Sequence, residues 1–216
     1  MRSAFLFDLD GVVIHSMPMH TEAWRIYLKR YGLDPGDLEA RMHGRRNDQI
    51  VAEYFGKKLS PEEAFHHGAA KEALFREMMA PQFEEHLVPG LLPFLECFAS
   101  IPKAIGTNAE PANVSFVLDR AGIRPRFRVI VDGMQVGKPK PDPEIYLTAA
   151  ERLGVEPSGC IVFEDSPAGV AAGRAAGMRV VGITTTADHL EGVEIHARDF
   201  FDSELASWLR RAIPDR

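Results

Sequence analysis

The sequence has few cysteines, no excess of positive charge and no long apolar run. Its two cysteines, Cys97 and Cys160, lie far apart, so we expect no disulfide framework and a reducing, cytoplasmic setting. No apolar run approaches membrane-spanning length, and the first residues lack the pattern of a signal peptide. A formal net charge of -6 argues against nucleic acid or an anionic membrane as the main partner.

Short apolar runs rich in β-branched residues alternate with helical patterns over most of the chain. The strand-like runs begin at Ala4, Lys103, Arg128, Cys160 and Arg179. Helical patterns lie between them at about 111–121, 142–153 and 167–176, and a closing helix is expected from Ser203. This alternation predicts an α/β fold with a Rossmann-like parallel sheet and helices on both faces.

Residues 17–84 follow a different pattern. Apolar residues recur there at helical spacing, and no strand-like run interrupts them. We expect a small helical-bundle cap domain inserted after the first strand. The catalytic core would then consist of residues 1–16 and 85–216.

Two acidic pairs follow buried strand-like runs: Asp8 with Asp10, and Glu164 with Asp165. The Asp10–Gly11 step taken alone also suits an ordinary turn. Two acidic pairs at the ends of strands in one sheet, however, require a compensating cation. Because carboxylate oxygens suit Mg²⁺ and no cysteine or histidine cluster has zinc spacing, we expect Mg²⁺.

The segment GKPKPDPEIY, residues 137–146, contains two candidate lysines. A solvated lysine is the ordinary alternative for each. Three prolines stiffen this loop, and a fixed lysine can neutralise a nucleophilic carboxylate together with a phosphate. We expect Lys138 to take this role and Lys140 to lie at the surface.

The segment IGTNAEP, residues 105–111, ends another strand-like run. Thr107 and Asn108 suit an ordinary helix N-cap. They equally suit a phosphate cradle made of a hydroxyl, backbone N–H groups and a helix start. Both alternatives stay open.

Four segments in this order, FDLDGVV, GTN, GKPKPDPEIY and VFEDSPAGVAAGRAAGM, resemble the motifs of the haloacid dehalogenase superfamily. The helical insert resembles its small helical cap, as found in β-phosphoglucomutase-like phosphatases and mutases. The resemblance implies that Asp8 is the nucleophile forming an aspartyl phosphate and that Asp10 is the general acid and base. The implied metal ligands are Asp8, Asp10 through its carbonyl, Asp165 and, through water, Glu164. The implied phosphate ligands are Thr107, Asn108 and Lys138.

The resemblance also points to the cap for substrate choice. His20, Lys71 and an arginine of HGRRNDQI, for which we prefer Arg46 to Arg45, are the candidates. Ordinary positions on solvated helix faces are the alternatives for His20 and Lys71. His15 stands where relatives usually have Asp, which leaves the hinge contacts unpredicted.

We therefore expect a Mg²⁺-dependent phosphohydrolase acting on a small phosphorylated metabolite, a sugar phosphate by preference. A β-phosphoglucomutase-type mutase is the alternative, and a non-catalytic small-molecule binding protein is a remote one. A nucleotide-binding oxidoreductase fits poorly, because the glycines of GVAAGRAAG, residues 169–177, lie in a helical pattern and suit close helix packing. We expect no nucleic-acid or membrane partner, and a monomer or weak homodimer.

Overall fold

The computed structural model describes residues 3–42, 45–56 and 59–213. The chain divides into two compact units, which we call the core unit (Met1–His15 with Leu87–Arg216) and the helical unit (Ser16–His86). Each is described by itself. Across the described ranges, no helix combines the length and apolar character needed to cross a membrane.

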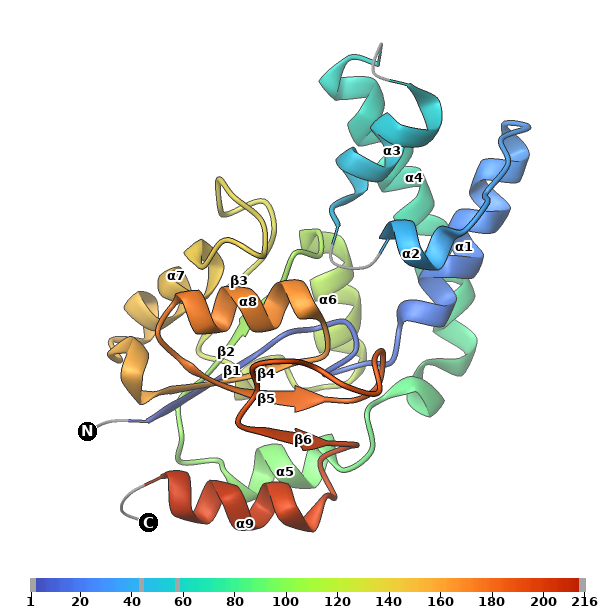
Figure 1. The fold of residues 1–216 in the computed structure, drawn as a ribbon. Helices are drawn as coiled ribbons and strands as arrows, with labels where there is room; N and C mark the ends of the chain where they lie inside the picture. Colours follow the sequence, from blue (N-terminus) through green and yellow to red (C-terminus); the bar gives the residue numbers. More distant parts are fainter. Residues whose placement is uncertain (1–2, 43–44, 57–58, 214–216) are drawn as a thin grey trace. The chain divides into compact units, whose positions relative to one another are not determined.

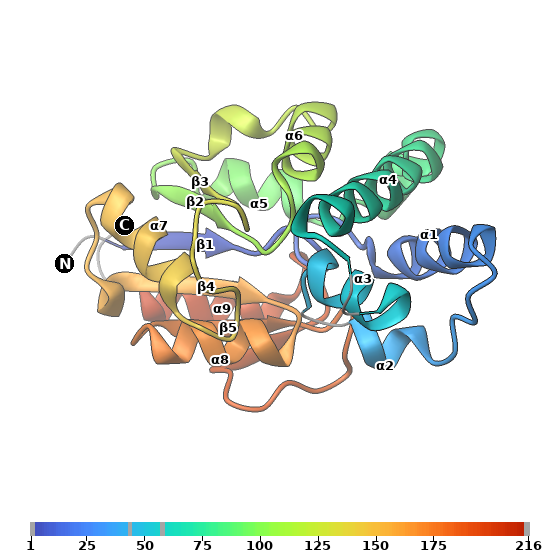
Figure 2. The same ribbon diagram turned by 90° about the horizontal axis from the view of Figure 1, so that it is seen from above.

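The core unit is built on a parallel sheet, as predicted. Within the described residues the sheet has six strands, in the order β3-β2-β1-β4-β5-β6. Figure 1 labels all of them, and Figure 2 shows β1 to β5 from above. Their bounds are β1 Ala4–Phe7, β2 Lys103–Gly106, β3 Val129–Val131, β4 Cys160–Glu164, β5 Arg179–Ile183 and β6 Ile195–Ala197. Strand β6 was not predicted, because its three residues IHA include a histidine and form no apolar run.

Helices cover both faces of this sheet, which confirms the predicted layers. Figure 1 shows α7 and α8 on one face and α5 and α9 on the other. The α-helices of the core unit are α5 Leu91–Cys97, α6 Pro111–Arg120, α7 Glu144–Leu153, α8 Pro167–Ala175 and α9 Ser203–Ala212. Two short 3₁₀ turns, η2 Arg124–Arg126 and η3 Pro157–Gly159, precede β3 and β4.

Strand β1 is central and buried on both sides. Successive side chains of a strand point to opposite faces. Accordingly Ala4 and Leu6 join the apolar cluster that contains residues of α7 and α8. Phe5 instead packs against phenylalanines on the other face, with ring centroids 5.2 Å from Phe98 and 5.3 Å from Phe163. The carboxyl end of β1, where the first acidic pair begins, is therefore rigidly held.

The glycines of α8 permit close packing, as predicted. A Cβ built on Gly169 would lie 1.8 Å from Oε1 of Glu164, and one on Gly173 would lie 2.8 Å from Cγ2 of Val180. Both positions lie inside a helix that begins at Pro167, where Ser166 caps the first turn by accepting the N–H of Gly169 at 3.1 Å. No side chain larger than hydrogen fits at Gly169 without moving the Glu164 carboxylate.

The helical unit contains α1 Met17–Arg30, α2 Leu38–Met42, α3 Asn47–Phe55, α4 Pro61–Met79 and the 3₁₀ segment η1 Ala80–His86. Helix α4 begins with a capping box. The Ser60 hydroxyl accepts the N–H of Glu63, and the Glu63 carboxylate accepts the N–H of Ser60 at 2.8 Å. Two charged residues of α4, Lys71 and Glu72, are buried inside this unit.

Candidate active site

The register of two neighbouring strands brings the acidic pairs together. Phe7 of β1 pairs with Phe163 of β4. Asp8, the residue after β1, therefore lies next to Glu164, the last residue of β4. Carboxylate oxygens of Asp8, Glu164 and Asp165 all lie within 4.8 Å of one another, and the three residues are buried. This arrangement at the carboxyl ends of parallel strands is typical of ligand sites in such sheets.

Asp8 is a buried carboxylate held by two contacts. Its Oδ1 accepts the N–H of Leu9 at 2.7 Å and lies 3.0 Å from Nζ of Lys140. Burial raises the pKa of Asp8 from 3.8 to about 7; Lys140 opposes this rise, while Glu164 and Asp10 add to it. A cation at the cluster would restore the charged form of Asp8.

The lysine at this cluster is Lys140, so the prediction that Lys138 faces the carboxylates and Lys140 lies at the surface is wrong. The Lys140 side chain is 3% exposed, and its Nζ also lies 2.6 Å from Oε1 of Glu164. The Lys138 side chain is 75% exposed, and its Nζ lies 3.6 Å from Asp142. Of the two lysines of KPKP, the second is the one that contacts the carboxylates.

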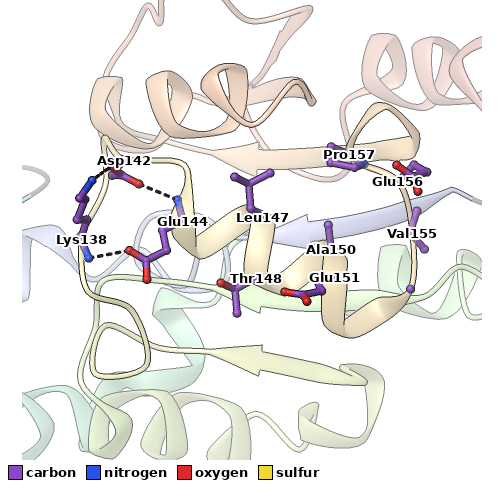
Figure 3. A pocket seen from close by; sticks show the side chains of 11 residues that line it. Lys138, Asp142, Glu144, Leu147, Thr148, Ala150, Glu151, Val155, Glu156 and Pro157 are labelled. Carbon is purple, nitrogen blue, oxygen red and sulfur yellow. Dashed lines mark hydrogen bonds and ion pairs between the residues drawn. The ribbon is translucent and has the colours of Figure 1, made fainter.

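Lys138 instead lines a groove of about 840 Å³ beside α7 (Figure 3). The groove is otherwise lined by Asp142, Glu144, Leu147, Thr148, Ala150, Glu151, Gly154, Val155, Glu156 and Pro157. The carboxylate cluster is not among its walls. Glu144 does serve the site indirectly, because its carboxylate accepts the N–H groups of Gly137 and Lys138, both at 2.9 Å, and so anchors the loop that carries Lys140.

Glu164 is buried and surrounded by donors. Its Oε1 accepts bonds from Lys140 and from the hydroxyl of Tyr146, both at 2.6 Å. Its Oε2 accepts the N–H of Asp165 at 3.1 Å and both the N–H and the hydroxyl of Ser166. Glu164 thereby holds Lys140 in place. Because both of its oxygens already accept hydrogen bonds, Glu164 suits contact with a metal through water better than direct ligation.

Asp165 is the third buried carboxylate. Burial raises the pKa of Asp165 well above its usual value, and the charges of Glu164 and Asp8 raise it further. The Thr186 hydroxyl donates a hydrogen bond to Oδ2 of Asp165 and opposes this shift. Thr186 was not predicted from the sequence, because it lies in a polar loop 21 residues after Asp165.

Asp10 lies half-buried in the tight loop that follows β1. The N–H of Gly11 donates to the carbonyl of Ile14 at 2.7 Å, and Gly11 has φ 76°, a conformation that glycine adopts at little cost. Asp10 and Ile14 form an isolated bridge. The loop therefore returns sharply, keeping Asp10 beside Asp8.

Thr107 and Asn108 follow β2, the other neighbour of β1. Thr107 is buried, and its hydroxyl accepts the N–H of Ala109 at 3.2 Å. Asn108 Oδ1 accepts the N–H of Lys140 at 3.2 Å, which ties this motif to the lysine loop. The N-cap of α6 is Glu110 and not either of these residues, so an ordinary N-cap does not account for them.

His20 and Lys71 lie inside the helical unit, not on solvated faces. Lys71 is 1% exposed; its Nζ lies 3.1 Å from Nδ1 of His20 and bonds to Glu72. The His20 ring stacks on Phe75 with centroids 3.7 Å apart. Asn47 donates to Glu72 at 2.6 Å, which completes a buried polar network around the lysine.

Of the two arginines, Arg46 has the longer ion-pair contact. Arg45 Nη1 lies 2.6 Å from Glu53 Oε2, whereas Arg46 Nε lies 3.6 Å from an exposed Asp48. Gly44, which precedes them, lies outside the described residues. His15 is half-buried and ends the first segment of the core unit.

The carboxylate cluster fits a divalent cation. Asp8, Glu164 and Asp165 share Lys140, so the negative charge of the group exceeds its positive charge. Burial raises the pKa of Asp8 and of Asp165, and the charges of the neighbouring carboxylates add to the rise. Oxygen ligands of this kind suit Mg²⁺.

Comparison with known proteins agrees with this geometry. The family model of the haloacid dehalogenase-like hydrolases matches residues 3–177. The chain belongs to this family. The resemblance inferred from its four motifs is thereby confirmed.

Individual relatives are phosphatases and phosphomutases. The chain is 33% identical over 187 residues to hexitol phosphatase A of Escherichia coli, covering 85% of this chain and 84% of that protein. It is 30% identical over 189 residues to the β-phosphoglucomutase of Bacillus subtilis, covering 83% and 82%. The crystal structure of a β-phosphoglucomutase from Clostridium difficile matches the fold with a TM-score of 0.84 at 27% identity, covering 98% and 97%.

Proposed function

We propose that this protein is a Mg²⁺-dependent phosphatase that hydrolyses a small phosphorylated metabolite, with a sugar phosphate as the preferred class. The observation that carries the proposal is the contact of Lys140 with both Asp8 and Glu164, beside Asp165. A nucleophilic carboxylate, a fixed cationic side chain and a cation-binding cluster are the parts that phosphoryl transfer needs.

In the first step, an oxygen of Asp8 attacks the phosphorus of the monoester. The bond between phosphorus and the substrate oxygen breaks, and Asp10 gives its proton to that leaving oxygen. In the second step, water attacks the aspartyl phosphate and Asp10 takes the proton from water. The bond to Asp8 breaks, phosphate leaves, and both carboxyl groups return to their starting states.

The other residues hold the transferring group and its charge. Lys140, fixed by Glu164 and Tyr146, lies where it can neutralise Asp8 and a phosphoryl oxygen together. Thr107 and Asn108 supply a hydroxyl and an amide at the end of β2. Asp8, Asp165 and the carbonyl of Asp10 would hold Mg²⁺, with Glu164 acting through water. When bound, Mg²⁺ offsets negative charge as it develops on the phosphoryl group.

A phosphomutase is the second candidate. The phosphoglucomutase relatives favour it, as does the buried His20–Lys71 contact, which is an unusual use of two polar residues in a helical bundle. In a mutase, a second sugar phosphate and not water takes the phosphoryl group from Asp8. Roles for His20, Arg46 and Lys71 in choosing the substrate stay predictions.

One assay separates the two candidates. Purified protein is mixed with Mg²⁺, β-glucose 1-phosphate and a trace of glucose 1,6-bisphosphate, and free phosphate and glucose 6-phosphate are followed together. Glucose 6-phosphate without phosphate release means a mutase. Phosphate release from this sugar or another small phosphate, abolished by EDTA and restored by Mg²⁺, supports the phosphatase. No release from a broad panel of phosphate esters would overturn the proposal.

A further inference from the structure

Three consecutive threonines follow β5, and the structure gives each hydroxyl a different acceptor. Thr184 Oγ1 donates to the carbonyl of Ala197 at 3.5 Å, which is a contact within the sheet edge. Thr185 Oγ1 donates to the carbonyl of Gly11 in the loop after β1. Thr186 Oγ1 donates to Oδ2 of Asp165 after β4. This short loop is thus bonded to two of the segments that form the carboxylate cluster.

Gly11 also lies against the Asp165 carboxylate, at the same oxygen that Thr186 bonds. A Cβ built on Gly11 would lie 1.8 Å from Oδ2 of Asp165 and 2.2 Å from its Cγ. Gly11 also has φ 76°, so a larger residue is excluded there twice over. Asp165 is buried, and both Gly11 and the Thr186 hydroxyl lie against its Oδ2, which restricts rotation of the side chain.

We infer that Thr186 is a positioning residue for the metal-binding carboxylate Asp165. A donor bonded to one carboxylate oxygen fixes the plane of the group, and the second oxygen is then presented in one orientation. Partners that hold a metal ligand in this way commonly contribute about 10- to 100-fold to metal affinity. The inference rests on the proposed function, because it takes Asp165 to be a Mg²⁺ ligand.

Thr185 reinforces the same arrangement from the neighbouring segment. Its bond to the Gly11 carbonyl ties the threonine loop to the loop that carries Asp10. Gly11 and Thr186 both lie against Oδ2 of Asp165, and Thr185, next to Thr186 in the chain, bonds to Gly11. Removing the Thr186 hydroxyl should therefore loosen Asp165 itself and leave Asp8, which Leu9 and Lys140 hold, in place.

The test is Mg²⁺ binding to the substrate-free protein by isothermal titration calorimetry, for wild type, Thr186→Val, Thr186→Ser and Thr184→Val. Valine keeps the shape of threonine without a donor, serine keeps the donor, and Thr184→Val removes a neighbouring hydroxyl that does not contact the cluster. We expect Thr186→Val to weaken Mg²⁺ binding about 10-fold or more. The Mg²⁺ affinities of Thr186→Ser and Thr184→Val should stay within about twofold of the wild-type affinity.

The outcomes separate this inference from the proposed function. If wild type binds Mg²⁺ and Thr186→Val binds it equally well, the positioning role is overturned while the function stands. If Thr184→Val weakens binding as much as Thr186→Val, the effect belongs to the loop and the positioning role is likewise overturned. If wild type itself fails to bind Mg²⁺, the proposed function fails first. Melting temperatures of all four proteins check that each is folded.

Discussion

Nζ of Lys140 lies 3.0 Å from Oδ1 of Asp8. The same nitrogen contacts Glu164 and lies 4.8 Å above the ring of Tyr146. Tyr146 and Lys140 both bond to Oε1 of Glu164, so one buried carboxylate oxygen fixes the lysine and the tyrosine together. The loop after β3, the start of α7 and the end of β4 thus converge on the proposed nucleophile.

The two lysines of KPKP offer a matched pair of substitutions. Lys140→Met should lower kcat/KM about 100-fold or more, because it removes the cation that stabilises Asp8 and the phosphoryl group. Lys138→Met should leave kcat/KM nearly unchanged, since that side chain is largely exposed. Steady-state kinetics on one phosphate ester checks both. A large loss at Lys138 with a small one at Lys140 would mean that the loop has a different structure.

Tyr146→Phe tests the support beneath the lysine. The change removes a donor from a buried carboxylate, which should cost about 1–3 kcal/mol of unfolding free energy. The melting temperature should then fall by about 2–4 °C per kcal/mol. Tyr54→Phe is the control, because that hydroxyl donates to a neutral carbonyl, of Pro35, at 2.5 Å. Equal losses in the two variants would show that the bond to Glu164 has no special weight.

The acidic part of the site could be predicted because it depends on local features. Asp8 and Glu164 each adjoin a short, apolar, buried run, and parallel strands end at a common edge. The choice between Lys138 and Lys140 could not be predicted, because the two lysines have similar neighbours in one stiff loop. Lys138 lies between a glycine and a proline, and Lys140 lies between two prolines. Contacts of the folded loop distinguish them: Glu144 accepts the N–H of Lys138, and Asn108 accepts the N–H of Lys140. One feature of the sequence could have indicated Tyr146: it is a hydroxyl-bearing residue on the apolar face of a helix, six residues after Lys140.

Other features escaped prediction because they depend on contacts between distant segments. Thr186 sits in a polar loop whose sequence gives no sign of its acceptor. Lys71 suits a solvated helix position by composition, and its burial depends on Glu72, His20 and the nearby ring of Trp24. The edge strand β6 is too short and too polar to produce an apolar run. The parallel sheet and its helical layers, by contrast, followed from the alternation of patterns.

Asp8→Asn should abolish turnover and yet stabilise the metal-free protein at pH 8. Burial raises the pKa of Asp8 to about 7, so between pH 4 and 7 the folded state keeps a proton that the unfolded state has lost. Stability therefore falls as pH rises through this window, and asparagine removes the penalty. We expect a melting temperature about 5 °C or more above wild type in EDTA at pH 8, and a smaller gap at pH 5.

The comparison with Mg²⁺ provides the control for this prediction. Adding Mg²⁺ at pH 8 should stabilise wild type more than Asp8→Asn, since the ion binds the charged carboxylate. The difference in melting temperature between wild type and Asp8→Asn should therefore be smaller with Mg²⁺ than in EDTA. A metal-free gap that is absent at pH 8, or larger at pH 5, would show that ionised Asp8 is not destabilising in the fold.

Lys71→Ala tests the predicted role of the helical unit in substrate choice. Loss of a charge-assisted hydrogen bond costs about 1.5–3 kcal/mol, which corresponds to roughly 10- to 100-fold in KM for a sugar phosphate. The KM for acetyl phosphate, which has no sugar, should change far less. Lys29→Ala, at an exposed position near the end of α1, should alter neither substrate. Equal losses on both substrates in the Lys71 variant would make Lys71 a structural residue.

The most direct measurement traps the covalent intermediate. The protein is mixed with Mg²⁺ and a phosphate ester that it hydrolyses, quenched in acid, and treated with borohydride, which reduces an aspartyl phosphate to homoserine. Peptide mass spectrometry then locates the modified residue. We predict homoserine at position 8, absent from Asp8→Asn and absent without Mg²⁺. Rapid turnover with an unmodified Asp8, or modification at another carboxylate, would contradict the assignment of Asp8 as the nucleophile.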